Sequence, residues 1–238
     1  MNNAIRSTYQ QLYKHFGPQG WWPTTPPGET RPRYYPGASR CLDERGQWEV
    51  IVGAILTQNT AWRNVEQALE ALSARQVLGL AALRALEVDE LAALIRPALY
   101  YNQKARRLQD IASYITQNYR GSTATLLQRP GPALRRELLS LKGIGPETAD
   151  CILLYAARYP FFVVDAYTRR ICSRLGLADE SATYPELQAL FMDKLPPDSD
   201  LFNEYHALLV QHAVTYCKSK PLCDSCCLKS RCHYAHKT

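Results

Sequence analysis

The stretch that decides the fold reads LKGIGPETADCILLY and runs from Leu141 to Tyr155. Two glycines stand two positions apart, Pro146 follows them, and an apolar run at helical spacing comes next. Proline is accepted in the first turn of a helix because its nitrogen needs no hydrogen-bond partner there. The pattern therefore predicts a helix-hairpin-helix: one helix ends at Leu141, a glycine turn follows, and a new helix begins at Pro146.

The turn itself consists of four residues that are candidates for binding a phosphate backbone: Lys142, Gly143, Ile144 and Gly145. Glycine permits positive φ and lets backbone N–H groups approach a phosphate, and the N-terminus of the following helix adds partial positive charge. A turn that only packs two helices together uses the same residues. The hairpin alone leaves both interpretations open.

Helical spacing of apolar residues recurs along the whole chain, whereas no segment alternates apolar and polar residues with period two. The segment FFVVD, residues 161–165, is too short to build a sheet. We therefore predict an all-α fold. The expected helices cover 48–56, 62–72, 86–95, 104–115, 133–141, 148–159, 167–175, 185–195 and 201–216, after a short amphipathic helix at the N-terminus.

The composition is that of a globular protein with a substantial core, since 46% of the 238 residues are hydrophobic and 21% are charged. The net charge of +6 suits a polyanionic partner without proving one. No run of 18 apolar residues could span a membrane, and the opening MNNAIRSTYQQLYKHF lacks the apolar core of a signal peptide. We expect a cytoplasmic protein that binds no membrane.

Residues 17–40 form an unusual segment that holds six of the fifteen prolines and cannot be regular helix. It also contains two adjacent tryptophans, Trp21 and Trp22, and two adjacent tyrosines, Tyr34 and Tyr35. Four large aromatic rings are poorly solvated unless they pack on something. We expect this segment to be ordered.

Cysteines are concentrated near the C-terminus, where five of the eight lie between Cys217 and Cys232. In a reducing compartment such a cluster favours a metal centre over disulfides. The spacing by itself leaves structural zinc and an iron–sulfur cluster open. The scattered Cys41, Cys151 and Cys172 are expected to be small buried residues.

These motifs together resemble the endonuclease III superfamily of DNA glycosylases, which is characterised by a helix-hairpin-helix, a Gly/Pro-rich loop and a following aspartate. Matching segments cover nearly the whole chain: EVIVGAILTQNT, YYNQKARRL, LKGIGPETAD, VVDAYTRRICSRLG and HALLVQHAVTYCKSKPLC. The resemblance implies two helical lobes. One is a six-helix lobe at 41–160 that ends in the hairpin, and the other is discontinuous, with 1–40 and 161–238, and carries a [4Fe-4S] cluster loop.

In this superfamily the aspartate supplies negative charge near the sugar and helps direct the nucleophile, and its counterpart here is Asp165. Asp165 also suits the N-cap of the helix that follows, and both roles are compatible. Bifunctional members carry a lysine two residues after the second glycine, where this chain has Glu147. A carboxylate cannot form a Schiff base, so the resemblance implies a glycosylase without AP lyase activity. Glu147 either stabilises the first turn of its helix or borders the base pocket.

The sequence is particularly similar to the monofunctional branch that excises 3-methyladenine and related alkylated purines. Shared segments are WWP at residues 21–23, LTQNT at 56–60, YNQKARRL at 101–108, KGIG followed by Glu147, and VVDAY at 163–167. The resemblance assigns Trp21, Trp22 and Pro23 to the base pocket, where aromatic walls suit a cationic alkylated purine. The alternative is that these aromatic residues clamp the N-terminal segment to the core, which we prefer for Tyr34 and Tyr35.

The same resemblance implies further contacts with a partner, which is double-stranded DNA containing a damaged base. Gln58 is expected to enter the gap left by the flipped base, and Lys104 to contact the backbone, although a solvated helix face would equally explain a lysine there. The family's cysteine spacing, Cys-x6-Cys-x2-Cys-x5-Cys, is matched here as x5, x2 and x5, one residue shorter in the first gap. The resemblance implies four cluster ligands, with Cys227 a neighbour that binds no iron. These ligands are Cys217, Cys223, Cys226 and Cys232.

The resulting hypothesis is a monomeric, monofunctional DNA N-glycosylase of base excision repair that hydrolyses the glycosidic bond of alkylated purines. Two alternatives remain open at this stage. One is an endonuclease III-like glycosylase for oxidised or mismatched bases with weak AP lyase activity, for which Lys142 offers an amine. The other is a non-catalytic module that binds damaged DNA.

Overall fold

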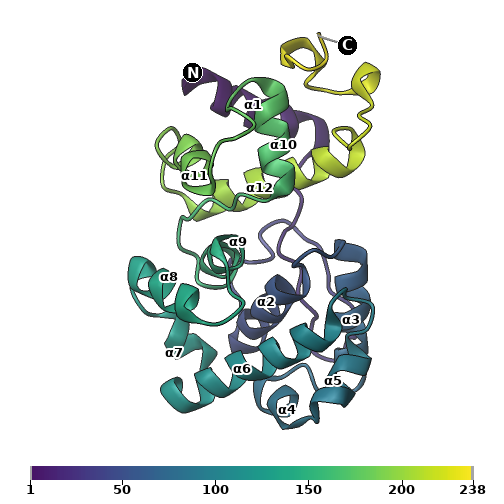
Figure 1. Cartoon of the computed structure of the whole chain (residues 1–238), viewed down its shortest axis with the longest axis vertical. Coiled ribbons are helices and arrows are strands. Elements are labelled where there is room, and N and C mark those ends of the chain that lie inside the picture. The colour runs from purple at the N-terminus through teal and green to yellow at the C-terminus, as the bar shows by residue number, and fades with distance from the viewer. Residues whose placement is uncertain (1, 237–238) are drawn as a thin grey trace. The chain divides into compact units, whose positions relative to one another are not determined.

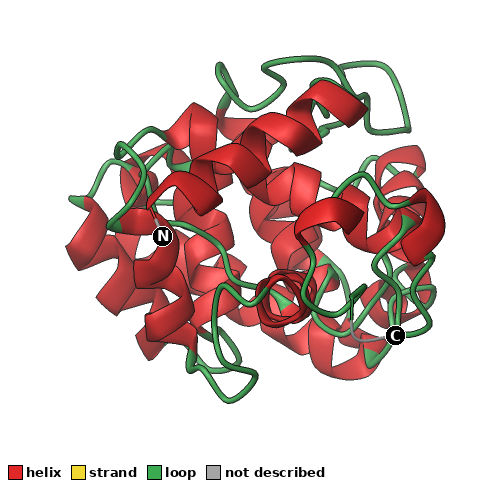
Figure 2. Ribbon diagram, turned by 90° about the horizontal axis from the view of Figure 1, so that it is seen from above, coloured by secondary structure: helices red, strands yellow, loops and turns green. Residues whose placement is uncertain are grey.

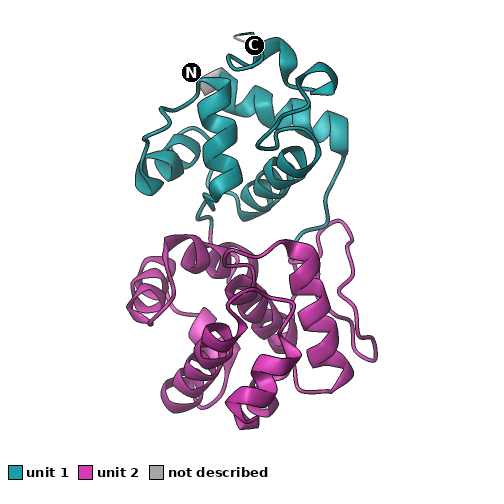
Figure 3. Ribbon diagram, turned by 45° about the vertical axis from the view of Figure 1, so that its right-hand side comes forward, with its two compact units in different colours: residues 1–21, 160–238 teal, residues 22–159 magenta. Residues whose placement is uncertain are grey.

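The computed structural model describes residues 2–236, and the chain divides into two compact units. The first unit contains residues 1–21 and 160–238, and the second contains residues 22–159 (Figure 3). Both are built from helices joined by loops (Figure 2). The only β-pairing within residues 2–236 is an isolated bridge between Thr24 and Arg33, so the all-α prediction is confirmed.

The second unit carries the hairpin at the end of a run of helices (Figure 1). Its helices are α2 (Glu44–Leu56), α3 (Trp62–Ala74), α4 (Leu80–Ala85), α5 (Val88–Leu94), α6 (Tyr101–Tyr119), α7 (Thr123–Leu127), α8 (Gly131–Ser140), α9 (Pro146–Cys151) and the π-helix η1 (Ile152–Ala156). The helix expected at 86–95 is α5, whereas α4 and α7 were not expected.

Helix α2 forms the centre of this unit and packs against η1, α6 and α7. Asp43 caps its N-terminus by accepting a hydrogen bond from the backbone N–H of Gly46 at 2.8 Å. The helix is buried from Trp48 to Leu56, and the indole nitrogen of Trp48 donates to the carbonyl of Leu78 at 2.8 Å. A helix that is apolar nearly all round belongs in a core.

The proline-rich segment is ordered as far as residue 40, but from residue 22 onward it belongs to the second unit. We expected all of residues 1–40 to join the discontinuous lobe. The difference has a local cause: the backbone N–H and the hydroxyl of Thr25 both donate to Oε1 of Glu49, at 2.9 and 2.7 Å, and Glu49 is fully buried in α2. These contacts attach the segment to the central helix.

The first unit is made from the two ends of the chain, and its helices are α1 (Asn2–Phe16), α10 (Ala166–Leu175), α11 (Tyr184–Met192) and α12 (Ser199–Thr215), followed by the 3-10 turns η2 (Cys223–Ser225) and η3 (Lys229–Arg231). α12 packs on both α1 and α10. The fully buried Tyr205 fixes the first of these contacts, because its hydroxyl donates to the carbonyl of Ile5 at 2.9 Å. Phe162, in the segment before α10, stacks on Phe191 with ring centroids 3.9 Å apart.

Within residues 2–236, no helix combines the length and the apolar character that crossing a bilayer requires.

Candidate active site and cysteine loop

The hairpin follows the predicted boundaries closely, since α8 ends at Ser140 and α9 begins at Pro146. Gly143 has φ +84°, a conformation in which an L side chain is strained. A Cβ there would also lie 2.8 Å from Cδ of Arg107. Gly145 differs, because its φ of −92° suits any residue and no atom lies within 4 Å of a Cβ placed on it. Gly143 is thus favoured by the backbone conformation of the turn, whereas Gly145 keeps open space beside the turn.

Gln58, in the loop between α2 and α3, reaches the hairpin within the same unit. Its amide nitrogen donates to the carbonyl of Gly143 at 3.0 Å and to the hydroxyl of Thr148 at 2.9 Å. Its amide oxygen accepts a hydrogen bond from Nη1 of Arg107 at 2.6 Å. Gln58 and Arg107 therefore hold the glycine turn in place, a role that sequence reasoning did not assign to either of them.

Lys104 requires a correction, because only 1% of its surface is exposed. Its ammonium donates to the carbonyl of Leu56, at the end of α2, at 2.8 Å, and to the hydroxyl of Thr60 at 2.7 Å. Burial, assisted by the charge of Arg107, lowers the pKa of Lys104 to about 8. The expected backbone contact is excluded by this burial. Lys142, in the turn, is exposed.

The tryptophan pair divides between the units, with Trp21 in the first and Trp22 in the second. Trp22 is only 2% exposed and packs edge-on against Trp62 and tilted against Tyr155, with ring centroids 5.1 Å away in both cases. Its ring also covers Gly53 of α2, where a Cβ would lie 2.8 Å from Cζ2. Pro23 is buried beside it in the chain, and Trp21 is half-buried.

Asp165 stands at the N-cap of α10, and its two carboxylate oxygens have different partners. Oδ1 accepts a hydrogen bond from the backbone N–H of Thr168 at 2.6 Å. Oδ2 lies 3.6 Å from Nε2 of His206 on α12, and the two side chains are 15% and 7% exposed. Both residues belong to the first unit.

Burial by itself raises the pKa of the Asp165 carboxyl, but His206 and the hydrogen bonds from Thr168 outweigh burial and hold it below its usual range. Asp165 is therefore a carboxylate at neutral pH. The thiol of Cys172 on α10 is affected in turn, because burial and the charge of Asp165 raise its pKa to about 12. Sequence reasoning did not single out His206, whose only signal is a polar residue on the buried side of a helix.

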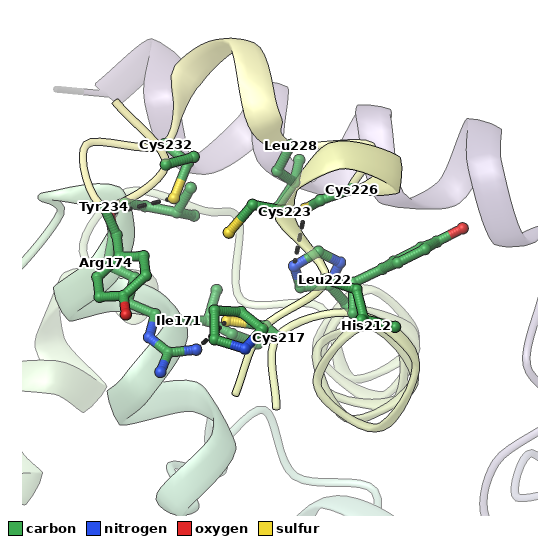
Figure 4. Close-up of a pocket in the computed structure, with 14 residues that line it drawn as sticks. Ile171, Arg174, His212, Cys217, Leu222, Cys223, Cys226, Leu228, Cys232 and Tyr234 are labelled. Atoms are coloured by element: carbon green, nitrogen blue, oxygen red, sulfur yellow. Dashed lines mark hydrogen bonds between the residues drawn. The ribbon is translucent and has the colours of Figure 1, made fainter. Parts of the chain in front are cut away.

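Four cysteines surround one pocket in the cysteine loop, residues 217–232 (Figure 4). They come from the end of α12, from η2 and from η3, and they are Cys217, Cys223, Cys226 and Cys232. Burial is the main cause that raises the pKa of the Cys226 thiol. Nη1 of Arg174 donates to the sulfur of Cys217 at 3.3 Å.

Cys227 lies outside the set of residues that line this pocket. Its sulfur is 3.9 Å from Nδ1 of His212, and its carbonyl accepts a hydrogen bond from Gln11 of α1. Among residues 2–236, no three His, Cys, Asp or Glu side chains are gathered so as to hold a single metal ion. The donor set is four thiols around a shared space.

Three features occur together in this chain: a helical hairpin with a glycine turn, an ionised aspartate at the N-terminus of α10, and a C-terminal loop with four cysteines. Together they define a protein of the helix-hairpin-helix DNA glycosylase class.

The chain belongs to the HhH-GPD superfamily of base excision DNA repair proteins, whose pattern it matches over residues 52–197. It is 43% identical to a protein of Methanocaldococcus jannaschii provisionally named a DNA repair glycosylase, over 96% of this chain and 95% of that one. It is 30% identical to an endonuclease III of Sulfolobus acidocaldarius, over 82% and 85% of the two chains.

Two solved structures have a similar fold. A covalent intermediate of endonuclease III with DNA gives a TM-score of 0.76 at 22% identity, covering 100% of this chain and 98% of that one. The 3-methyladenine DNA glycosylase MagIII of H. pylori, bound to 1,N6-ethenoadenine, gives 0.64 at 28% identity, covering 88% and 94%. The chain is thus a DNA glycosylase of base excision repair, and DNA is its partner.

Proposed function

We propose that the protein hydrolyses the N-glycosidic bond of alkylated purines in duplex DNA and leaves an intact abasic site, without AP lyase activity. The single observation that carries this proposal is that the chain has an ionised Asp165 and also has Glu147 at the sequence position where bifunctional relatives have a lysine. The first group suits hydrolysis, and the second cannot form an imine.

Asp165 has the charge that this chemistry needs. When the bond between C1′ and the base nitrogen breaks, positive charge develops on the sugar, and a carboxylate stabilises it. A water molecule then bonds to C1′, its proton passes to the carboxylate, and the base leaves with the electron pair of the broken bond. A purine alkylated at N3 or N7 is cationic beforehand and leaves as a neutral base, so no strong general acid is required.

We assign the role of the missing lysine to neither Lys104 nor Lys142. Lys104 has the lowered pKa of a nucleophilic lysine, but it is buried inside the second unit with its ammonium bonded to Leu56 and Thr60. Lys142 is exposed, but it precedes both glycines and suits a phosphate contact. We assign Lys142 and the backbone of residues 143–145 to DNA binding, and Gln58 to support of the turn and contact with the flipped-out site.

The choice of an alkylated purine rests on the WWP segment and on the likeness to MagIII, which was solved with an ethenoadenine. Aromatic rings attract a cationic base through stacking and cation–π contacts, worth about 0.5–2 kcal/mol. We propose Trp21, Trp22 and Pro23 for base recognition. Trp22 is only 2% exposed and holds the segment in place by packing on Trp62 and Tyr155, whereas Trp21 is half-buried.

We assign a [4Fe-4S] cluster to the four cysteines, because they line one pocket and their spacing resembles that of the endonuclease III family. Such a cluster takes one thiolate at each of four corners. Cys217, Cys223, Cys226 and Cys232 would hold it. The cluster would supply cross-linking of the loop, and the loop's basic residues, Lys218, Lys220, Lys229 and Arg231, would then face phosphates.

A second candidate is removal of an oxidised or mismatched base, which is favoured by relatives that are named endonuclease III and thymine-DNA glycosylase. One experiment separates the two. Duplex DNA carrying N-methylated purines, and matched duplexes carrying an oxidised pyrimidine or a mismatch, are incubated with wild type or Asp165→Asn. Released bases are identified by chromatography, and the strands are analysed with and without alkali.

The proposal expects release of methylpurines, breaks only after alkali, and a loss of about 100-fold or more in Asp165→Asn. Release of only the oxidised or mismatched base would replace the substrate assignment. Strand breaks without alkali would overturn the monofunctional assignment, and undiminished turnover by Asp165→Asn would remove Asp165 from the mechanism. Absence of base release from every duplex would favour a module that only binds damage.

A further inference from the structure

We propose that His206 is a positioning residue for Asp165: it fixes the direction of the carboxylate oxygen that is left for catalysis. This inference rests on the proposed role of Asp165 in hydrolysis. Its basis is the division of the carboxylate between two partners within the first unit.

The oxygen Oδ1 is committed to the helix, because it accepts the Thr168 N–H at 2.6 Å as the N-cap of α10. A catalytic role therefore falls to Oδ2, which lies 3.6 Å from Nε2 of His206. The Nε2 atom is itself buried from solvent. At 3.6 Å the two atoms are farther apart than in a hydrogen bond, so His206 acts on Oδ2 through its charge or dipole.

The position of His206 is well determined by its helix. Its neighbour Tyr205 is fully buried and bonded to Ile5 of α1, and α12 also packs along α10, which Asp165 caps. The two side chains are thus held by elements that pack directly on each other. A partner fixed in this way can restrict rotation of the carboxylate about its Cα–Cβ and Cβ–Cγ bonds, and misplacement by about 1 Å can cost about 100-fold in rate.

Charge supports the same conclusion. Asp165 is buried, and burial favours the neutral acid, which can neither stabilise a cation nor accept a proton from water. His206 and the Thr168 N–H are the groups that oppose this tendency and keep the pKa of Asp165 low. The remaining titratable neighbour, Cys172, has a pKa of about 12 and stays a neutral thiol in the working range.

The test compares His206→Ala, His206→Gln and the control His15→Gln in the full chain. Gln retains an N–H donor of similar reach, and His15 is an exposed histidine of α1 in the same unit. Four quantities are measured for each protein: the thermal unfolding midpoint, the affinity for damaged duplex, the single-turnover rate constant from pH 4 to 9, and the pH titration of the Asp165 carboxyl carbon by NMR. The Asp165→Asn protein identifies the NMR signal.

For His206→Ala we expect a single-turnover rate about 100-fold below wild type, with nearly unchanged affinity for DNA. Its acidic limb of activity and the titration of Asp165 should both move to higher pH, because burial is then opposed by Thr168 alone. His206→Gln should recover part of the rate, and His15→Gln should match wild type. If His206→Ala does not fold, the NMR titration is measured on His206→Gln instead, and the pKa of Asp165 must still be higher than in wild type.

These measurements distinguish a failure of the positioning role of His206 from a failure of the proposed function. If Asp165→Asn is inactive while folded His206 variants keep the wild-type rate and the wild-type Asp165 titration, the positioning role is overturned and the proposed function stands. If Asp165→Asn retains full activity, the proposed function fails, and the positioning role fails with it. A uniform loss of stability in His206→Ala, with no change in the Asp165 titration, would reduce His206 to a packing residue.

Discussion

The side-chain amide of Gln58 joins the loop after α2 to the hairpin, since its nitrogen donates to the carbonyl oxygen of Gly143 at 3.0 Å. Together with the contacts to Thr148 and Arg107, this connects three separate segments of the second unit through one carboxamide. The glycine turn is therefore held by its surroundings in one conformation, and its stability can be tested apart from catalysis.

Replacing Gln58 by Ala should loosen the turn. The change removes three hydrogen bonds from a half-buried position, so we expect a loss of about 1–3 kcal/mol in the free energy of unfolding and weaker binding of damaged duplex. Chemical denaturation and fluorescence anisotropy measure the two effects. Wild-type stability together with weakened DNA binding would show that Gln58 acts on DNA alone.

The two glycines of the hairpin should respond differently to Ala. Gly143→Ala places a Cβ at φ +84° and against Arg107, so it should lower the free energy of unfolding by more than about 1 kcal/mol. Gly145→Ala has open space and an ordinary φ, so it should unfold like wild type and lose only affinity for DNA, where a methyl group blocks close approach of a phosphate. Equal losses of stability in both variants would contradict this distinction.

Substitutions of Lys104 and Lys142 should have different effects, one on the stability of the fold and the other on electrostatic binding of DNA. Lys142→Ala should reduce by about one the slope of log affinity against log salt concentration, because one phosphate contact is removed. Lys104→Met should leave that slope unchanged, since its ammonium is buried, but should lower stability by about 1–3 kcal/mol. Binding titrations at several salt concentrations distinguish them. An altered slope in Lys104→Met would place that lysine at the DNA.

The lowered pKa of Lys104 also predicts a pH dependence of stability. Between pH 8 and the ordinary lysine pKa near 10.5, the unfolded chain binds more protons at Lys104 than the folded chain does. The contribution of this group to the free energy of unfolding should therefore rise with pH across that window. Subtracting the Lys104→Met curve from the wild-type curve isolates it, and a flat difference would argue that the amine titrates normally.

Serine substitutions should distinguish the four cysteines that bind the cluster from Cys227, which does not bind it. Changing any one of Cys217, Cys223, Cys226 or Cys232 should reduce the iron and acid-labile sulfide content per chain and destabilise the first unit, whereas Cys227→Ser should retain both. Metal analysis of anaerobically purified protein provides the measurement. Stoichiometric zinc in place of iron and sulfide would reverse the choice of cofactor.

A lysine at position 147 should restore the missing chemistry. Glu147 is exposed in the first turn of α9, so Glu147→Lys requires no repacking and places an amine where bifunctional relatives have one. The variant should be trapped covalently on abasic DNA by borohydride, which reduces an imine to a stable amine, whereas wild type and Glu147→Gln should not. Efficient trapping of the wild type would mean that another amine serves the lyase step.

The sequence predicted the hairpin, the boundaries around Pro146 and the N-cap role of Asp165, because each depends on local rules that glycine, proline and aspartate obey strongly. The short helices α4 and α7 were harder to predict, since short apolar helices carry little periodic signal. Burial of Lys104 could not be read at all. A lysine in a basic run looks solvated until the end of α2 at Leu56 and the following loop at Thr60 bring acceptors to it.

His206 shows the same limitation at the candidate site. Sequence places it 41 positions after Asp165 on another helix, and only the packing of α12 on α10 brings the two side chains together. Residue identity and spacing indicate which chemistry is available. They do not indicate which long-range partner controls the charge of a given group.

The hydrogen bonds from Thr25 to Glu49 determine where the second unit can be truncated without loss of stability. A fragment of the second unit that starts at Cys41, just before α2, would leave the buried carboxyl group of Glu49 without its donors and a hollow above Gly53 where Trp22 had been. Proteases should accordingly spare residues 22–40 although no helix runs through them, and the shortest stable fragment of the second unit should begin at Trp22.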